Sequence, residues 1–455
     1  MAQPPSKIGR IARLGGLTSR VSGSYLGQRI LGAFQDEETR EASLRKLHLE
    51  NAEKVVETMG ALKGAAMKVG QSIALMADGM DLPADVTRVL SKLHDRAEPV
   101  PFADIQRAIE RELSAEQRSQ FEHIDPTPLG TASLAQAHAA FLTDGTPVVI
   151  KVLHEGVEHS VDTDLGALKA LLVSGRVLRR DREELDAVFE EIRDRLNEEL
   201  DYYQEAANME QLRRGLAGVE GLSVPRTYPE LCTGRVLTMD RLDGLPLERF
   251  LESATPAARQ RAGNLLVRGF HEMFYRMRAL HADPHGGNYL FRSDGGVGLL
   301  DFGCVKRFDV DWVADYARMA LSIINQDRPR FLEASRHLGT LASAEPEAES
   351  LLWELGGAIV GPLCMPYYRC GIPSDDVMDR VNKLAPRVIR RTDVRSPRNL
   401  VFLHRALGGI YAMLRKLGHE ADYGTFVRPY IAHGIGVSEL RVPDGAPVSA
   451  HFRVA

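Results

Sequence analysis

The spacing of hydrophobic residues predicts that the first quarter of the chain is helical. Residues 37–77 carry hydrophobic side chains three and four positions apart, at Leu44, Leu47, Val55, Met59 and Leu62. This spacing is typical of a helix with one buried face. Pro83 ends the run, and residues 102–113 form a second helical stretch. We therefore expect a helical region before the first strand.

The pattern then changes to one that favours strands. Residues 130–141 are followed by turn residues at 143–146 and by the apolar residues 147–153, which together predict a β-hairpin. The second of these strands carries a single lysine, Lys151. A lysine in an apolar strand must reach solvent or an anion, and we favour phosphate as its partner. Residues 235–240 predict a further strand.

The remainder of the chain is mainly helical by the same criterion. The predicted helices cover residues 164–180, 183–216, 257–280, 310–325, 329–338, 345–360, 374–384 and 397–417.

A short segment in the second half of the chain carries the clearest chemical pattern. Asp283 and Asn288 have the D-x-x-x-x-N spacing of a kinase catalytic loop. Two short strands, at 289–291 and 297–300, would return the chain so that Asp301 lies beside Asn288. Magnesium prefers hard oxygen ligands, so the Asn288 amide and the Asp301 carboxylate suit it. Asp283 would act as a base or orient the attacking oxygen.

Three carboxylates lie close together in the predicted helix at 183–216, namely Glu199, Asp201 and Glu205. Asp201 and Glu205 would share a helical face because they are four residues apart, so one of them could pair with Lys151. The alternative is a solvated acidic face, and helix geometry alone favours that alternative.

Composition narrows the class of protein. The 455 residues are 44% hydrophobic and 26% charged, as in ordinary globular proteins. A formal net charge of -5 argues against bulk nucleic-acid binding. The four cysteines have neither a disulfide-framework nor a zinc spacing. No apolar stretch has the length needed to cross a bilayer. We expect a soluble or peripheral protein.

The first 35 residues are basic and contain no Asp or Glu. Hydrophobic residues recur at helical spacing, at Ile8, Ile11, Leu14, Leu17 and Val21. A helix here would be apolar on one side and basic on another. It would lie on an anionic membrane surface, or cover part of the protein as a solvated helix; an organellar transit peptide is a third alternative.

These motifs resemble those of the UbiB/AarF-type atypical protein-kinase-like family, whose members support coenzyme Q biosynthesis. The resemblance covers about residues 58–308 and extends more loosely to Ile431. Lys68-Val69-Gly70-Gln71 is similar to the family's K-x-G-Q motif, and Glu199-Leu200-Asp201 to its E-x-D motif. Glu205 falls where the family has its lysine-pairing glutamate.

Two further segments carry the resemblance. Ala132-Ser133 is similar to the alanine-rich loop that this family has in place of the glycine-rich loop of kinases. Gln136 and His138 match the positions that follow this loop in the family. Residues 281–288 resemble the catalytic loop H-A-D-P-H-P-G-N. The chain departs from the family at Gly130-Thr131, where alanines are frequent, and near Gly287.

The resemblance implies an α+β fold, namely a two-lobed protein-kinase-like fold with a helical N-terminal extension and a mostly helical C-lobe. The implied parts are a basic amphipathic segment at 1–36, a helical extension at 37–115, an N-lobe with inserted helices at 116–243, a C-lobe at 244–440 and a tail at 441–455. It also implies that the extension packs over the active site. That packing would bring Lys68 opposite Glu199 and Asp201.

The implied activity is that of a Mg-dependent, ATP-binding atypical kinase or ATPase that supports ubiquinone (isoprenoid-quinone) or lipid metabolism. Expected ATP-binding residues are Lys151, Glu205, Ala132, Ser133, Met239, Asn288 and Asp301. Asn288 and Asp301 would bind magnesium, and Asp283 would be the catalytic residue. The implied regulatory residues are Lys68, Gly70, Gln71, Glu199 and Asp201.

Two alternatives remain open for the activity: a small-molecule kinase similar to aminoglycoside phosphotransferases, and a nucleotide-responsive scaffold with little turnover. Expected partners are ATP or ADP, an anionic membrane surface or a prenyl-lipid or quinone intermediate, and proteins of quinone biosynthesis, but no nucleic acid. We expect a cytoplasmic protein without a transmembrane segment, and a peripheral position on the inner face of the membrane is an alternative.

Overall fold

The computed structural model describes residues 99–132, 134–157, 200–372 and 376–437, together with single residues between 15 and 57 and between 161 and 197. The chain divides into two compact units. The first unit consists of Met1–Ala206 and Thr227–Arg241, and the second of Ala207–Arg226 and Leu242–Ala455.

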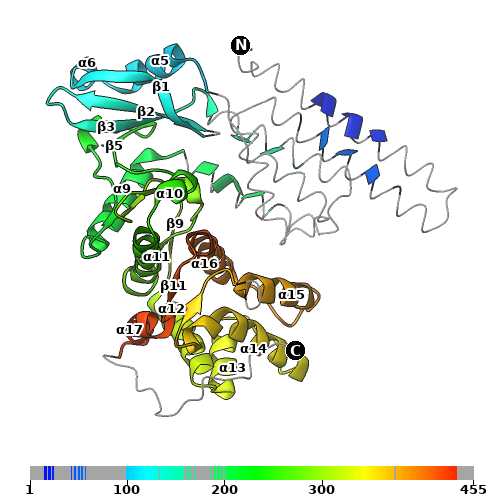
Figure 1. Cartoon of the computed structure of the whole chain (residues 1–455). Helices are drawn as coiled ribbons and strands as arrows, with labels where there is room; N and C mark the ends of the chain where they lie inside the picture. Colours follow the sequence, from blue (N-terminus) through cyan, green and yellow to red (C-terminus); the bar gives the residue numbers. More distant parts are fainter. Residues whose placement is uncertain are drawn as a thin grey trace. The chain divides into compact units, whose positions relative to one another are not determined.

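The first unit is built on a four-stranded antiparallel sheet in the order β1-β2-β3-β5 (Figure 1). The strands are β1 (Phe121–Thr131), β2 (Ala135–Leu142), β3 (Pro147–Leu153) and β5 (Val236–Asp240). The short helices of this unit are α5 (Phe102–Glu112), α6 (Ala115–Arg118) and the 3-10 helix η3 (Pro229–Leu231). The predicted hairpin and the predicted helix at 102–113 agree with these elements.

The core of this unit lies between α5 and the sheet. Helix α5 buries Ile105, Ala108 and Ile109 along one side. The apolar residues that alternate along β3 meet them from the sheet, at Val148, Ile150 and Val152. Lys151 lies between Ile150 and Val152 and therefore points to the opposite face of the sheet.

The basic N-terminal segment is described at a few positions, two of which are hydrophobic. Leu17 and Val21 are helical and only 1% and 3% exposed. Three residues beyond Val21, Ser24 accepts a hydrogen bond from the buried Asn51 amide at 3.0 Å. Protein therefore covers the apolar side of the segment at these positions. This favours a helix that covers the protein over one whose apolar side lies on a membrane.

The helix predicted at 183–216 is wrong at its centre. Leu200 lies in a turn, and a new helix, α9 (Tyr202–Gly215), begins after Asp201. The Asp201 carboxylate accepts hydrogen bonds from the backbone N–H groups of Tyr203 and Gln204, at 3.0 and 3.4 Å. Asp201 is thus an N-terminal cap. It does not share a helical face with Glu205, and the sequence interpretation missed the capping pattern.

The second unit is mostly helical. Its helices are α10 (Leu247–Ser253), α11 (Pro256–His271), the π-helix η4 (Glu272–Met277), the 3-10 helix η5 (Gly286–Asn288), α12 (Val310–Ile324), α13 (Arg328–His337), α14 (Pro346–Val360), the 3-10 helix η6 (Gly361–Cys364), α15 (Val377–Ile389), α16 (Arg398–Leu417) and α17 (Tyr423–Ile435). Most of these agree with the predicted helices; α10 and α17 were not predicted.

Short strands complete this unit. They are β4 (Leu222–Ser223), β6 (Ala279–His281), β7 (Tyr289–Phe291), β8 (Val297–Leu299), β9 (Val305–Arg307), β10 (Tyr368–Arg369) and β11 (Glu420–Ala421). The strand β6 corrects the helix predicted at 257–280. That helix widens into η4 and stops at Arg278, whose φ of 52° is left-handed. Residues 279–281 then pair with β9.

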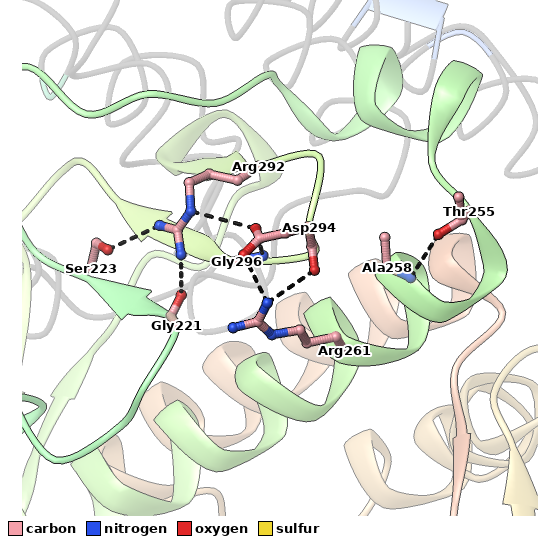
Figure 2. A network of polar contacts seen from close by, with 8 residues as sticks. All are labelled: Gly221, Ser223, Thr255, Ala258, Arg261, Arg292, Asp294 and Gly296. Carbon is pink, nitrogen blue, oxygen red and sulfur yellow. Dashed lines mark hydrogen bonds and ion pairs between the residues drawn. The ribbon is translucent and has the colours of Figure 1, made fainter.

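The predicted hairpin of β7 and β8 is present and antiparallel. Figure 2 shows how its turn is held: Arg292 donates to the Ser223 hydroxyl at 3.1 Å, and Arg261 of α11 donates to the Asp294 carboxylate at 2.7 Å. Gly295 has a φ of 85°, and a Cβ at this position would overlap the Ala258 carbonyl. These contacts fix the hairpin that leads to Asp301.

No helix within the part of the chain that the structure describes is both long enough and apolar enough to span a membrane.

Candidate functional site

The candidate functional residues of the first unit form an ion pair between β3 and α9. The Lys151 Nζ donates to both oxygens of Glu205, at 2.8 and 2.9 Å. The side chains of Lys151 and Glu205 are only 17% and 3% exposed. Tyr202 adds its ring 5.2 Å from the same ammonium group. Glu205 lies in the first turn of α9, where the positive end of the helix dipole favours a carboxylate.

Ala132 lies in the loop between β1 and β2. Its N–H donates to the Ala135 carbonyl at 2.8 Å, and its carbonyl lies 3.4 Å from His154 Nε2. Burial lowers the pKa of the His154 imidazole. Met239 lies in β5, is 6% exposed and pairs with Val149 of β3.

The side chains of Gln136 and His138 in β2 make hydrogen bonds that support the fold. His138 Nδ1 lies 2.7 Å from the Asp125 carbonyl, which can only accept, so this nitrogen carries the proton. Its Nε2 then accepts from the Gln136 amide at 3.0 Å. The Gln136 amide oxygen accepts from the Val100 N–H at 3.0 Å. These two side chains therefore tie β1, β2 and the segment before α5 together.

Several predicted site residues lie outside the described residues. They are Lys68, Gly70, Gln71, Ser133 and Glu199. Asp201 is described, and its carboxylate caps α9. The interpretation of these residues as a regulatory group stays a prediction.

The candidate functional residues of the second unit lie in and beside the loop that follows β6. The Asn288 amide nitrogen donates to the Asp283 carbonyl at 2.9 Å and lies 3.4 Å from the Asp283 carboxylate. His285 Nδ1 accepts from the Gly287 N–H at 3.1 Å. The loop is thus closed on itself by its own side chains, and Asp283 and Asn288 lie together as their spacing predicts.

Asp301 lies beside this loop. The Leu300 N–H donates to the Asn288 carbonyl at 3.0 Å, so the two segments run next to each other. His281 hydrogen-bonds the Asp301 carbonyl. One carboxylate oxygen of Asp301 accepts from the Gly303 N–H at 3.0 Å. These contacts hold the carboxylate in one orientation.

The side-chain oxygens of Asn288 and Asp301 suit a magnesium ion. The NH₂ group of Asn288 is engaged with Asp283, which leaves the amide oxygen as the ligand atom. Together with the Asp301 carboxylate it supplies two hard oxygens. Magnesium sites commonly use one or two protein oxygens and complete their shell with phosphate and water. Among the described residues no group of three or more His, Cys, Asp or Glu is arranged to hold a metal.

The sequence interpretation missed Arg405. This residue of α16 donates to the Asp283 carboxylate at 2.7 Å. The next turn of α16 also approaches the loop, because a Cβ at Gly409 would lie 2.7 Å from the Pro284 carbonyl oxygen. An arginine in an amphipathic helix carries no sequence signal of its own. The pair of glycines at 408 and 409 was the available signal, since adjacent glycines inside a helix often mark a close approach.

The structure thus brings Lys151 to Glu205 in the first unit, and Asp283, Asn288 and Asp301 together in the second.

Comparison with known proteins gives consistent matches. The ABC1 atypical kinase-like domain matches residues 92–335. The chain is 27% identical over 430 residues to the mitochondrial atypical kinase coq-8 of Caenorhabditis elegans, covering 92% of this chain and 57% of that protein. It is 28% identical over 451 residues to the mitochondrial atypical kinase COQ8B of Rattus norvegicus, covering 97% of this chain and 83% of that protein.

A solved structure is also similar. The Mycobacterium tuberculosis protein Rv3197, solved in complex with erythromycin, matches with a TM-score of 0.62 and 22% identity. The match covers 88% of this chain and all of that chain. At this identity the likeness concerns the fold.

Proposed function

Because the chain belongs to the ABC1 atypical kinase-like family, we propose that it binds Mg·ATP and transfers or hydrolyses the γ-phosphoryl group. The family match and the named relatives confirm the resemblance to UbiB/AarF-type proteins and the α+β, kinase-like fold. The kinase-like family binds nucleotide. The identity of the metal and of the phosphoryl acceptor belongs to this proposal.

The ion pair of Lys151 and Glu205 is the observation that carries the proposal. A buried lysine held by a glutamate on a neighbouring helix is the arrangement with which kinases present an ammonium group to the α- and β-phosphates. Both carboxylate oxygens contact Nζ, so Glu205 holds the lysine in place. We propose that Lys151 contacts these phosphates and that Ala132, Ser133 and Met239 border the nucleotide.

Asn288 and Asp301 supply the oxygen ligands in this proposal. When bound there, magnesium would neutralise the negative charge of the phosphates. Asp283 would orient the acceptor oxygen and accept its proton. Arg405 would hold the Asp283 carboxylate in position through the 2.7 Å contact. Phosphoryl transfer depends mainly on placement and charge stabilisation, and these residues provide both.

The role that we propose for Lys68 rests on the resemblance to the family's K-x-G-Q motif. We propose that it contacts Glu199 and Asp201 and restricts how the nucleotide is bound. In Lys68→Ala we expect a changed nucleotide affinity or turnover with the protein still folded. Unchanged affinity and unchanged turnover would contradict this assignment.

For the biological role we propose support of isoprenoid-quinone or lipid metabolism, because the chain is similar to the atypical kinases coq-8 and COQ8B over nearly its whole length. An anionic membrane that carries a prenylated phenol lipid is the surface we would test. The relatives coq-8 and COQ8B are named as mitochondrial, and a peripheral position on a membrane is our own proposal.

The test is to follow the label of γ-labelled ATP with full-length protein, with and without magnesium, and with and without anionic vesicles that carry a prenylated phenol lipid. Asp301→Asn should abolish turnover. Asp311→Asn, which changes an exposed carboxylate in the first turn of α12, should not.

The destination of the label separates the candidate activities. Free phosphate that depends on magnesium indicates an ATPase, and label on the lipid indicates a lipid kinase. Tight nucleotide binding without turnover in all conditions would contradict the enzyme proposal and favour a nucleotide-responsive scaffold.

A further inference from the structure

The helices of the second unit surround a cavity of about 380 Å³. Its walls come from α11, η4, α12, α14, α15, α16 and α17, all of which belong to the second unit. An engineered apolar cavity of roughly 150 Å³ is large enough to bind benzene, so this cavity has room for a larger molecule. None of its lining residues belongs to the magnesium or lysine sites described above.

Apolar side chains dominate the walls. Leu355 and Ile359 of α14, Val381 of α15 and Leu407 of α16 all line the cavity. All four are only half-buried, although they lie on helices of a packed unit. Protein interiors are normally packed without such space. An apolar space of this size therefore indicates a binding site, since pockets for small molecules are concave and mostly apolar.

The π-helix η4 forms part of the wall and contributes Phe274 and Tyr275. Such helices are rare, and they occur frequently at functional sites. Helix α17 packs closely against this wall, because a Cβ at Gly434 would lie 2.7 Å from the Tyr275 ring. The irregular helix is therefore a fixed part of the cavity.

His271 gives the apolar cavity a polar group. Its Nδ1 lies 2.7 Å from the Val267 carbonyl, so Nδ1 carries the proton. Burial lowers the pKa of this imidazole to about 4, which keeps it neutral near pH 7. Its Nε2 is then a hydrogen-bond acceptor. Within the described part of the chain, no donor reaches that nitrogen.

His404 of α16 also lines the cavity. Its Nε2 is 3.5 Å from the Tyr316 hydroxyl, which is too long for a strong hydrogen bond. Burial lowers the pKa of His404 to about 4 as well. The cavity thus has no charged histidine near neutral pH. An anion would find no positive charge among these groups, whereas a neutral molecule with a hydroxyl group would find a hydrogen-bond acceptor.

We propose that this cavity is a binding site for a small, mainly aliphatic molecule that carries one hydroxyl group, and that the hydroxyl donates to His271 Nε2. The apolar walls would take the chain of the ligand, and the imidazole would select for the hydroxyl. The site goes beyond the proposed phosphoryl transfer and does not depend on it. Binding can therefore be tested without nucleotide.

The test uses two isomers, 1-octanol and heptyl methyl ether, which differ in the hydroxyl donor but not in composition. Binding to the full-length protein is followed by calorimetry and by the shift in unfolding temperature. We expect 1-octanol to bind about 2- to 10-fold more tightly than the ether, the range for one hydrogen bond. In His271→Phe the two isomers should bind equally.

Gly408→Leu is the variant that fills the cavity. Gly408 lines the cavity inside α16, and a Cβ there would meet no atom within 4 Å. Leucine also favours a helix more than glycine does, so this variant should fold and should lose binding of both isomers. The matched control is Gly218→Leu, at an exposed glycine that also has no atom within 4 Å of an added Cβ. It should bind as the unchanged protein does.

Three outcomes would overturn the proposal. They are no binding of either isomer to the unchanged protein, undiminished binding to a folded Gly408→Leu, and equal affinity for the two isomers in the unchanged protein. Circular dichroism of each variant shows whether it is folded. Should Gly408→Leu not fold, the isomer preference in His271→Phe decides the question alone.

Discussion

The guanidinium of Arg405 lies 2.7 Å from the carboxylate of Asp283, although the two residues are 122 positions apart in the sequence. The backbone carbonyl of Asp283 also accepts a hydrogen bond from the Asn288 amide. The carboxylate that we assign to catalysis is therefore held from its own loop and from α16. Because the side chain of Asp283 is 46% exposed, the arginine is better placed to orient it than to stabilise the fold.

Removal of the Arg405 side chain should impair the chemical step more than nucleotide binding. In Arg405→Ala we expect kcat for ATP turnover to fall by about 10- to 100-fold, since small misplacements of a catalytic group have effects of this size. The KM for ATP should change by less than about threefold, because Arg405 is not among the proposed phosphate contacts.

The control for this variant is Lys416→Ala on the same helix. Lys416 pairs with Glu248 at an exposed position, and its loss should leave kcat unchanged. Arg405→Lys should recover part of the activity if the charge positions Asp283. A rise in KM and a fall in kcat, together with a loss of folding, would show that Arg405 has a structural role instead.

The ion pair of Lys151 and Glu205 should behave as a buried pair. Lys151→Met leaves the nearly fully buried Glu205 carboxylate without its cation. We expect the free energy of unfolding to fall by about 3 kcal/mol, with nucleotide affinity lower by about 10-fold or more. The double variant Lys151→Met/Glu205→Met should recover much of the stability but none of the affinity.

Urea unfolding of the single and double variants measures the coupling between the two side chains. Arg387→Met is the control, since Arg387 pairs with Glu354 at an exposed position. That change should cost no more than about 1 kcal/mol. Additive effects of the changes at 151 and 205 would contradict a coupled pair.

The half-buried histidines of the cavity should make stability depend on pH. Burial lowers the pKa of His271 to about 4 in the folded protein, whereas an unfolded histidine has a pKa near 6.5. Between these values the unfolded chain binds more protons, so stability falls as the pH drops from 7 toward 4. For His271 alone the loss between pH 7 and pH 5 is about 2 kcal/mol.

Urea unfolding at pH 7 and pH 5 checks this dependence. His271→Phe should reduce the loss of stability by that amount, because one titrating group is gone. His433→Gln, at an exposed position of α17, should leave the pH dependence as it is. An unchanged pH dependence in His271→Phe would show that His271 is not the buried neutral group that we infer.

The sequence was sufficient to predict which residues lie together where their spacing along the chain decides it. Asp283, Asn288 and Asp301 depend on a loop and a hairpin of a few residues, and local patterns determine those. The strand that carries Lys151 was predicted for the same reason, because a single charge interrupts an apolar run. In each case the residues are close together in the sequence, or they lie on a strand that the sequence pattern predicts clearly.

What the sequence did not predict depends on tertiary contacts or on competition between local structures. The pairing of β6 with β9 overrode the helical pattern at 279–280. The Asp201 cap divided a helix that hydrophobic spacing had joined. Arg405 reaches Asp283 only once α16 has packed on the loop, and no pattern in α16 marks that residue among its other basic residues.

The two adjacent glycines of α16 give a prediction in which each serves as the control for the other. A Cβ at Gly408 would meet open space, whereas a Cβ at Gly409 would lie 2.5 Å from Pro284 Cγ and 2.7 Å from the Pro284 carbonyl oxygen. Both positions are inside the helix, where alanine is favoured over glycine by up to about 1 kcal/mol. Gly408→Ala should therefore be neutral or stabilising, with unchanged turnover.

Gly409→Ala should have the opposite effect. The helix would have to move away from the loop, or the loop away from the helix, at a cost of about 1–3 kcal/mol. Because Pro284 follows Asp283 directly, this displacement should also weaken the contact with Arg405 and lower kcat. Urea unfolding and ATP turnover of the two variants measure both effects. Equal behaviour of the two alanine variants would mean that α16 does not press on the loop at Pro284, and α16 would then position Asp283 through Arg405 alone.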